Sequence, residues 1–343
     1  MNAVEATVIA SELTARGLTV RAGAPLGALT TYGVGGTAAV LVEVTGADDA
    51  RAVGDVMSSH PGVPVMAFGN GSNTLVSDGG FEGVVVRTRP GTDPASMNVV
   101  VSDGAVTVPA WMPLPVLARR SVAAGGCGLE WAVGVPGTVG GAVRMNAGGH
   151  GAEIIDNLVS VDVVSLVTGR SATLDAGELA LHFRGSALGP THCVVSAKFS
   201  VSPPGAHDCE DALAEIVAWR RRNQPGGRNA GSVFVNPAPG DGSSGALIDG
   251  CGLRGRSVGG ASVSEKHANF IQASPDATAA DVINLMTTVQ DEVRTATGTV
   301  LRSEVRLIGF GEDVIARFAD AAHESDEVRD ARAAISVRLG EQP

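Results

Sequence analysis

The sequence predicts a mixed α+β and α/β fold of three units followed by a C-terminal tail. At 343 residues the chain exceeds the size of one ordinary hydrophobic core. Short apolar runs typical of strands alternate with stretches of helical periodicity, and glycine-rich loops follow some of these runs. A proline and glycine break at Ser202–Gly205 marks one boundary. We expect units at 1–90, 91–204 and 205–312, and a tail at 313–343.

The pattern of the first unit is that of a small α/β module. A strand pattern precedes a helix whose apolar residues fall on one face, and two further strands flank a glycine-rich loop. The expected elements are a helix over 1–22, a glycine-rich turn at Thr30–Gly36, a strand at Ala38–Val44, a helix at Ala47–Ser58, and strands at 64–68 and 83–87.

The second and third units repeat this alternation. In the second we expect a hairpin that pairs 98–102 with 105–108, a helix over 114–124, and strands at 158–167 and 193–201. In the third we expect helices over 208–222 and 278–297, with strands at 256–263 and 299–308. The tail has helical propensity but little bulky apolar content, so we expect a surface helix and assign it no chemistry.

The composition excludes several classes of function. With 25 Lys and Arg against 36 Asp and Glu, the formal charge is -11, which disfavours a general surface for nucleic acid or anionic membrane. The first 23 residues carry charges and lack the apolar core of a signal peptide, and no run is long enough to span a bilayer. We therefore expect a cytoplasmic protein. The sequence does not define an oligomer, and a monomer is the expectation.

The four cysteines do not form a metal-binding or disulfide pattern. Cys127, Cys193, Cys209 and Cys251 are far apart, with no C-x-x-C pair and no histidine at ligand spacing. We therefore expect neither a disulfide scaffold nor a structural metal site.

Two glycine-rich loops are the strongest local signals in the chain. Gly69–Asn73 follows the apolar run 64–68, and Glu130–Gly149 contains many glycines among apolar residues. Small residues let backbone N–H groups approach an anion closely. Each loop alone is equally consistent with a tight turn between a strand and a helix. Together they predict a pyrophosphate held from two sides.

Nine short motifs, the two glycine-rich loops among them, follow one another along residues 26–309. Through them the chain resembles the UDP-N-acetylenolpyruvoylglucosamine reductases, flavoenzymes of peptidoglycan precursor synthesis. The motifs are Thr31–Gly36, Gly69–Asn73, Gly134–Ala142, Asn146–Glu153, Phe183–Ser186, Ala230–Pro237, Ile248–Leu253, His267–Phe270 and Ser303–Val305.

The resemblance implies a two-part FAD-binding domain of the vanillyl-alcohol-oxidase type plus a separate α/β substrate domain. It also implies non-covalent FAD, NADPH as hydride donor and a UDP-sugar substrate. Arg220 matches a flavin-contacting position. The residues that would hold FAD at the two loops are Gly69, Asn70, Gly71, Ser72, Asn73, Val135, Pro136, Gly137, Thr138, Gly140 and Gly141.

Three residues match the catalytic positions of this family. The resemblance implies that Arg184 binds the substrate carboxylate, that Ser232 protonates the α-carbon, and that Glu304 orients and polarises the carboxylate region. An always-charged, planar guanidinium suits the first role, and a positioned acid suits the others. Taken singly, the three residues would be a surface ion-pair partner, a turn residue and an exposed strand residue.

Other correspondences concern the UDP portion of the substrate. Asn236, Arg254 and His267 match positions near it, although His267 is equally well explained as a structural histidine. The run Arg220–Arg222 is also explained as a cationic cap at a helix C-terminus.

The chain departs from the family pattern at three positions. Asn223 replaces a usual lysine, Val235 replaces a residue that is often basic or polar, and Phe183 replaces a tyrosine. Arg222 or Arg228 could compensate for the lysine. The short segment between Ser202 and Asp208 resembles the shorter-loop subtype. These departures keep two alternatives open, namely another FAD-dependent oxidoreductase or oxidase on the same fold, and a flavin- or nucleotide-binding module without turnover.

Overall fold

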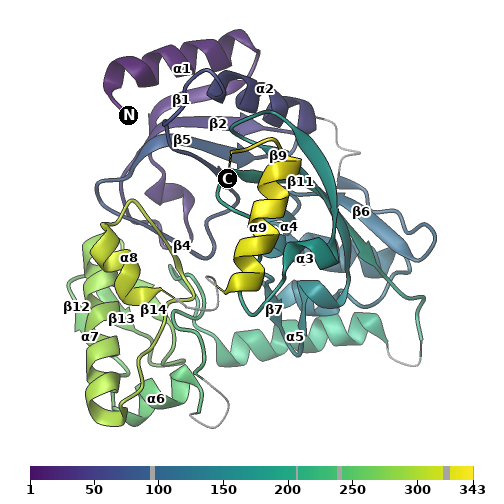
Figure 1. Ribbon diagram of the computed structural model, residues 1–343. Coiled ribbons are helices and arrows are strands. Elements are labelled where there is room, and N and C mark those ends of the chain that lie inside the picture. Colours follow the sequence, from purple (N-terminus) through teal and green to yellow (C-terminus); the bar gives the residue numbers. More distant parts are fainter. Residues whose placement is uncertain (93–96, 206–207, 238–241, 320–324, 343) are drawn as a thin grey trace.

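The computed structural model describes residues 1–92, 97–205, 208–237, 242–319 and 325–342. Two four-stranded sheets, three smaller strand groups and the surrounding helices make up these parts of the chain (Figure 1). Residues 206–207 of the short connecting segment, and residues 320–324 and 343 of the expected tail, lie outside the described residues.

The first sheet has the order β1-β2-β5-β3, with parallel pairing of β5 to both β2 and β3. Its central strands are valine-rich and buried, as expected for strands covered on both faces. Two helices pack on one face through Ile9, Leu13 and Val53 (Figure 1). The elements are α1 (Ala3–Ala15), β1 (Thr19–Ala24), β2 (Ala38–Val44), α2 (Ala47–Met57), β3 (Val65–Phe68) and β5 (Phe81–Thr88).

The second sheet is antiparallel, with the order β10-β9-β11-β6. Its inner face shares one core with short helices, which places the second glycine-rich loop beside β11. The elements are β6 (Ala105–Pro109), α3 (Leu114–Ala123), the 3-10 helix η3 (Glu130–Gly134), α4 (Val139–Arg144), β7 (Gly148–Gly149), β8 (Ala152–Glu153), η4 (Ile154–Asp156), β9 (Leu158–Ser165), β10 (Ser171–Asp175), η5 (Ala176–Leu179) and β11 (His192–Ser200).

A long helix connects the second sheet to the third part of the fold. This helix, α5 (Cys209–Asn223), starts at Asp208, whose side chain accepts hydrogen bonds from the backbone N–H groups of Glu210 and Asp211. Its apolar residues pack against the core of the second sheet. In Figure 1 the helix runs beneath that sheet toward the third part.

The third part has its own core around α7 (Ala279–Thr297). A capping box of Thr278 and Asp281 starts this helix, and Gly298 ends it in the left-handed conformation. The same core includes Tyr32 and Leu75 from the first part of the chain. The other elements are α6 (Ser244–Gly250), β12 (Ser257–Val258), β13 (Ala261–Val263) and β14 (Ile271–Ala273).

A parallel strand pair joins the first and last parts of the fold. β4 (Thr74–Val76) follows the first glycine-rich loop, and β15 (Arg306–Ile308) follows Glu304. Pairing of Thr74 with Arg306 brings together the two segments that precede these strands. The expected boundaries at 90, 204 and 312 stay predictions.

The tail is helical and packs on the second sheet. It contains α8 (Glu312–Phe318) and α9 (Asp326–Arg338). Ile335 and Leu339 are buried in the core of that sheet, because the few apolar residues of α9 gather on one face. Figure 1 shows α9 lying alongside β11 and α4.

Four expected elements differ from those observed. The hairpin expected to pair 98–102 with 105–108 is reduced to one bridge between Ser102 and Ala105, because β6 pairs with β11 instead. The first helix ends at Ala15, and Gly17 takes a positive φ of 82° before β1 begins. A turn at Gly259 and Gly260 divides the strand expected at 256–263. Only 306–308 of the strand expected at 299–308 is paired as a strand, and of the described residues before it only Ser303 forms a bridge, to Phe234.

A disulfide joins Cys127 and Cys209, contrary to the expectation that the cysteines would not pair. They are 82 residues apart in sequence, but their Cα atoms lie 6.1 Å apart because α5 begins beside the segment that bridges Cys127 to Ser202. The carboxylate of Glu130 lies close to both sulfurs. Since the sulfurs are bonded to each other, they are not thiolate ligands for a metal ion.

Candidate active site

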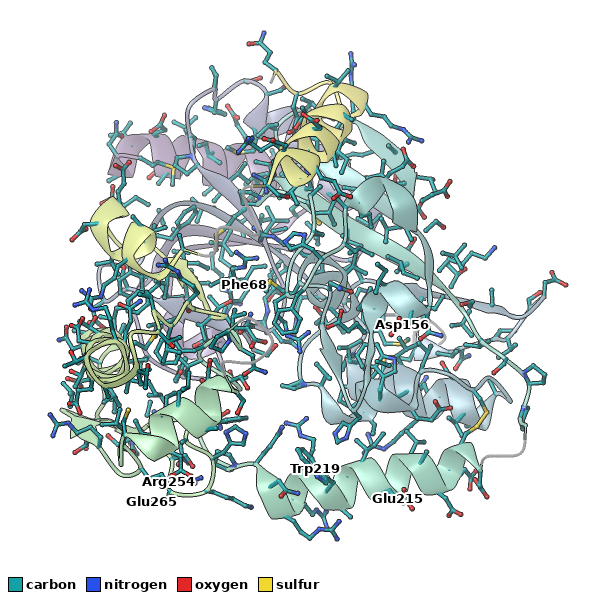
Figure 2. All side chains as sticks on the ribbon, turned by 60° about the horizontal axis from the view of Figure 1, so that its bottom comes forward. Phe68, Asp156, Glu215, Trp219, Arg254 and Glu265 are labelled. Carbon is teal, nitrogen blue, oxygen red and sulfur yellow. A yellow bond between two sulfur atoms is a disulfide. The ribbon has the colours of Figure 1, made fainter. Side chains whose placement is uncertain are left out.

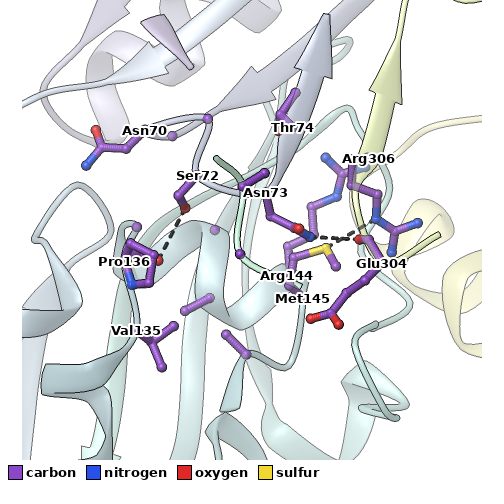
Figure 3. A pocket seen from close by; sticks show the side chains of 18 of the residues that line it. Asn70, Ser72, Asn73, Thr74, Val135, Pro136, Arg144, Met145, Glu304 and Arg306 are labelled. Carbon is purple, nitrogen blue, oxygen red and sulfur yellow. Dashed lines mark hydrogen bonds between the residues drawn. The ribbon is translucent and has the colours of Figure 1, made fainter. Parts of the chain in front are cut away.

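One cavity of about 730 Å³ brings the two glycine-rich loops together with the three residues matched to catalytic positions. Gly69–Asn73 and 134–138 line one part of it, and Arg184, Ser232 and Glu304 line another. These residues come from all three parts of the fold. Figure 3 shows the loop residues Ser72 and Pro136 on one side of the view and Glu304 with Arg306 on the other.

The two loops contact each other directly. The Ser72 hydroxyl donates to the carbonyl oxygen of Pro136 at 3.2 Å (Figure 3). Gly137 has a φ of 119°, and a Cβ atom there would lie 2.7 Å from Ser72 Oγ. At Gly69 a Cβ atom would lie 2.6 Å from Thr138 Oγ1. The φ of Gly137 favours glycine there, and at both positions a Cβ would displace a hydroxyl group of the facing loop.

The first loop is also held from its other side. The backbone N–H of Thr31 donates to the carbonyl of Gly71 at 3.2 Å, so the turn Thr30–Gly36 supports the loop. All twelve residues predicted to bind the cofactor line the cavity, including Gly140 and Gly141 of α4 and Arg220 of α5.

Asn73 connects the first glycine-rich loop, Gly69–Asn73, to Glu304. Because β4 and β15 are parallel, the residues that precede them lie side by side. The Asn73 amide donates to the carbonyl of Glu304 at 2.9 Å, and the backbone N–H of Arg306 donates to the carbonyl of Asn73 at 3.0 Å (Figure 3). The loop and the candidate catalytic carboxyl group therefore form one continuous wall.

Arg184 lies between two carboxylates. Its Nε donates to Glu304 Oε1 at 2.8 Å and its Nη1 donates to Glu153 Oε1 at 2.9 Å. The guanidinium also lies 4.5 Å from the centre of the Phe183 ring. The φ of Arg184 is 56°, an unusual value for a residue with a side chain, and such values gather at functional sites.

Burial raises the pKa of Glu304 above its ordinary value, and the negative charge of Glu153 adds to this effect. The charge and hydrogen bond of Arg184 oppose it without cancelling it. One guanidinium between two carboxylates leaves a net negative charge, which favours retention of a proton on the more buried group. Glu304 is thus suited to hold a proton near a reacting anion.

Ser232 lies beside this cluster. It follows Gly231, which has a φ of 80°, and forms a bridge with Phe270. The next residue, Val233, accepts a hydrogen bond of 2.8 Å from the backbone N–H of Glu304. The Ser232 backbone is therefore held between the segments that carry Glu304 and Phe270, with the residue facing the cavity.

Comparisons with known proteins define the family. A profile described as "UDP-N-acetylenolpyruvoylglucosamine reductase, C-terminal domain" matches residues 223–308, and one described as "FAD binding domain" matches residues 38–175. The UDP-N-acetylenolpyruvoylglucosamine reductase of Gloeobacter violaceus is 42% identical over 296 residues, 84% of this chain and 96% of that protein. The chain belongs to the UDP-N-acetylenolpyruvoylglucosamine reductase family.

Further relatives agree with this assignment. The enzyme of the same name from Synechococcus sp. (strain WH7803) is 42% identical, with coverage of 83% of this chain and 92% of that protein. The crystal structure of the Thermus caldophilus reductase (MurB) has a TM-score of 0.71 and 33% identity, and the match covers 85% of this chain and 98% of that one.

A more distant structure supports the fold class. The Physcomitrella patens BBE-like 1 protein has a TM-score of 0.58 at 13% identity, with 95% of this chain and 96% of that one covered. The predicted FAD-binding fold of the vanillyl-alcohol-oxidase type, with an additional domain, is confirmed. Within the described residues, no helix is both long and apolar enough to cross a bilayer.

The residues that the family resemblance placed near the UDP portion divide into two groups. Asn236 lines the cavity, and its side-chain oxygen accepts from the backbone N–H of Ser244. Arg254 and His267 are not among the lining residues. Arg254 pairs with Asp249 through Nε at 2.6 Å and donates to the carbonyl of Glu265 at 2.7 Å. Figure 2 shows Arg254 and Glu265 at the outer edge and Phe68 near the centre.

His267 has the environment of a structural histidine. Its ring lies 4.7 Å from that of Phe270, and its Nδ1 accepts from the backbone N–H of Asn269 at 3.3 Å. Burial lowers its pKa, and the nearby charge of Arg254 lowers it further. Its role at the reductase substrate stays a prediction.

The three departures from the family pattern occupy different environments. The Asn223 amide donates to the carbonyl of Trp219 at 2.7 Å, so it ends α5 without contributing a charge. Val235 pairs through its backbone with Arg302. Phe183 supports Arg184 with its ring, and this contact does not need the missing hydroxyl. Among the residues suggested to compensate, Arg228 donates to the carbonyl of Pro275.

Sequence reasoning did not single out three residues of the reductase site. Glu153 pairs with Arg184, and Arg144 and Arg306 line the cavity. The signal for Glu153 was its place in the motif Asn146–Glu153. Arg306 begins β15 two residues after Glu304.

Proposed function

We propose that this chain catalyses the NADPH-dependent, FAD-mediated reduction of the enolpyruvyl group of UDP-N-acetylglucosamine enolpyruvate. The product would be UDP-N-acetylmuramate, a precursor of peptidoglycan. Family membership supports the reaction, and the observation that carries it here is the convergence of Arg184, Ser232 and Glu304 on the cavity lined by both glycine-rich loops. We infer a cytoplasmic location, because the nucleotide-linked substrate and NADPH are cytoplasmic metabolites.

The cavity fits the cofactor. The two contacting loops are rich in glycine and present backbone N–H groups to the cavity, which suits a pyrophosphate. In addition, the Gln224 side-chain oxygen is buried at the cavity wall without a hydrogen-bond partner in the described parts of the chain. A buried polar atom of this kind favours a polar ligand. When bound, FAD would accept a hydride from NADPH and supply it to the vinyl carbon of the substrate.

Arg184 would bind the carboxylate of the substrate. Hydride addition to the vinyl carbon places negative charge on the adjacent carbon and its carboxylate, and a fixed cation stabilises that charge. Arg184 is fixed by Glu304 and Glu153, with side-chain exposures of 18%, 17% and 29%. Contacts from two sides hold its orientation before the substrate arrives.

Ser232 would donate the proton to the α-carbon, and Glu304 would stay protonated near the substrate carboxylate. A serine hydroxyl is a weak acid, but the carbanion-like centre is a strong base at the moment of transfer, so a positioned hydroxyl suffices. Glu304, with its raised pKa, would hold a proton toward the carboxylate and so reduce the repulsion between two anions.

The test is an anaerobic two-step measurement of flavin absorbance. NADPH alone should bleach the bound flavin, and subsequent addition of the enolpyruvyl nucleotide sugar should restore its absorbance without oxygen. If NADPH bleaches the flavin but only oxygen restores it, the protein is another flavin oxidoreductase. Flavin that binds but is not bleached would indicate a binding module without turnover.

A further inference from the structure

Arg144 is a cation at the cavity wall that the proposed reaction has not yet used. Arg144 is the last residue of α4, is half-buried and lines the cavity. No acidic side chain pairs with its guanidinium in the parts of the chain that the structure describes. By contrast, Arg184, on the same wall, has two carboxylates.

Two further arginines lie near Arg144, so positive charge is concentrated in this part of the protein. Burial, together with the charges of Arg306 and Arg332, lowers the pKa of Arg144 to about 10. Arg306 lies on the same wall, with its Nε donating to Met145 Sδ at 3.2 Å. A desolvated cation among other cations is costly for the fold unless an anion compensates it. The cavity therefore requires a negative charge near Arg144.

The position of Arg144 indicates which anion this is. The Arg144 carbonyl accepts from the Ser186 hydroxyl at 2.8 Å, and Arg306 Nη2 donates to the carbonyl of Arg184 at 3.4 Å. These contacts tie Arg144 and Arg306 to the segment that carries Arg184. In Figure 3, Arg144 and Met145 lie toward Glu304 and away from Pro136 of the second glycine-rich loop.

Three anions take part in the proposed reaction besides the nucleotide phosphates of the substrate and of NADPH. The FAD pyrophosphate is assigned to the two glycine-rich loops, and the substrate carboxylate is assigned to Arg184. The remaining anion is the flavin ring system itself, because addition of a hydride to the neutral oxidised ring produces a ring with one negative charge.

We infer that Arg144 is a positioning charge for the flavin, which stabilises the anionic reduced ring and so raises the reduction potential of bound FAD. This inference rests on the proposed use of FAD but not on the identity of the substrate. A cation near the pyrimidine side of a flavin is a recognised means by which proteins tune this cofactor. The positive charge of Arg306 would stabilise the reduced ring in the same way.

The experiment measures the two-electron midpoint potential of bound FAD without substrate. Arg144→Met should lower the preference for reduced over oxidised flavin at least tenfold, which corresponds to about 30 mV. Arg144→Lys keeps the charge and should stay near the wild-type potential. Arg119→Met removes an exposed arginine of α3 outside the cavity and is the matched control. An unchanged potential in Arg144→Met, or equal loss in Arg144→Lys, would overturn the inference.

A second measurement needs no variant. If the reduced ring is held as an anion, the wild-type potential should fall by about 30 mV per pH unit, since one proton accompanies two electrons. Uptake of two protons doubles that slope to about 59 mV. The measurement is made in mildly acid buffer, where free reduced flavin takes up its second proton, and a doubled slope there contradicts the inference. Failure of the proposed reaction would instead appear as normal potentials with no reoxidation by the nucleotide sugar.

Discussion

Arg184 donates through Nε to Glu304 Oε1 at 2.8 Å, although the two residues are 120 positions apart. The contact joins the second part of the fold to the strand β15 that returns from the third part. Because Glu153 binds the same guanidinium, the three side chains carry one positive and two potential negative charges. This arrangement couples the protonation of Glu304 to the site where we expect the substrate carboxylate.

Glu304 should impose an alkaline limit on the substrate half-reaction. Its pKa is raised in the folded protein, mainly by burial, so the protonated form persists to higher pH than in a free glutamic acid and is lost as the pH rises through that pKa. Above it, reoxidation of reduced flavin by substrate should slow by about tenfold per pH unit. Stopped-flow absorbance across a pH series measures this rate.

Glu304→Gln provides the matched test, because glutamine cannot titrate. The variant should lose the alkaline limb while flavin reduction by NADPH continues. Glu312→Gln, at an exposed position in α8, should keep the wild-type profile. An alkaline limb that persists in Glu304→Gln would assign the titration to another group.

Ser232→Ala should separate the two half-reactions. Loss of the hydroxyl removes the proposed proton donor, so reoxidation by substrate should slow by about 10²–10⁴-fold. Flavin reduction by NADPH should stay within about twofold of wild type, since no substrate proton is transferred in that step. Ser257→Ala, on the exposed strand β12, serves as control. Equal slowing of both half-reactions by Ser232→Ala would contradict the assigned role.

The features that the sequence predicted are those encoded locally. The glycine-rich loops at Gly69–Asn73 and 134–141 were predictable, because their residue types limit how the backbone can approach a ligand. The strand Ala38–Val44 was also predicted with its observed bounds, since its valine-rich run suits a buried parallel strand. The catalytic candidates came from motif correspondence, and the structure places all three at one cavity.

The features that were missed depend on contacts between distant segments. The Cys127–Cys209 disulfide follows from where α5 begins, which spacing along the chain does not reveal. The position of Arg254 outside the cavity depends on its pairing with Asp249 in the third part of the fold. Arg144 was missed because the role we infer for it depends on its charged neighbours, which among the described residues are Arg306 and Arg332 from distant segments.

The disulfide should stabilise the oxidised protein against unfolding. It closes a segment of 82 residues between Cys127 and Cys209, so its loss should lower the free energy of unfolding by about 2–4 kcal/mol. Denaturant titration of wild type with and without reductant measures the difference, and Cys127→Ser should match the reduced protein. Cys251→Ser, at a cysteine without a disulfide, should retain the response to reductant. A wild-type protein insensitive to reductant would argue against the bond.

The end of the tail should contribute stability that is lost in acid. Glu341 Oε1 accepts from the Ser165 hydroxyl at 2.7 Å, and Oε2 accepts from His192 Nε2 at 3.2 Å. The backbone N–H of Gly189 donates to His192 Nδ1 at 3.0 Å, so the proton of the neutral ring is on Nε2 and points to Glu341. This carboxylate thus fixes the end of the chain beside His192, which lines the cavity.

The pKa of Glu341 determines the sign of the effect. Burial would raise it, but hydrogen bonds from His192 and Ser165 outweigh burial and hold it below its ordinary value. A lowered pKa in the folded state stabilises the fold above the unfolded-state pKa of about 4.3, and the contribution disappears as the pH falls through the folded-state value. Glu341→Gln should therefore lower the free energy of unfolding at neutral pH by about 1–3 kcal/mol.

Denaturant titrations at neutral and acid pH measure this contribution. The difference between wild type and Glu341→Gln should shrink as the pH falls, because the wild-type carboxylate becomes protonated and the charged hydrogen bonds are lost. Glu215→Gln alters an exposed residue of α5 and should behave like wild type at both pH values. A difference between wild type and Glu341→Gln that is constant with pH would mean that Glu341 acts through packing alone, because the contribution of its ionised carboxylate must disappear in acid.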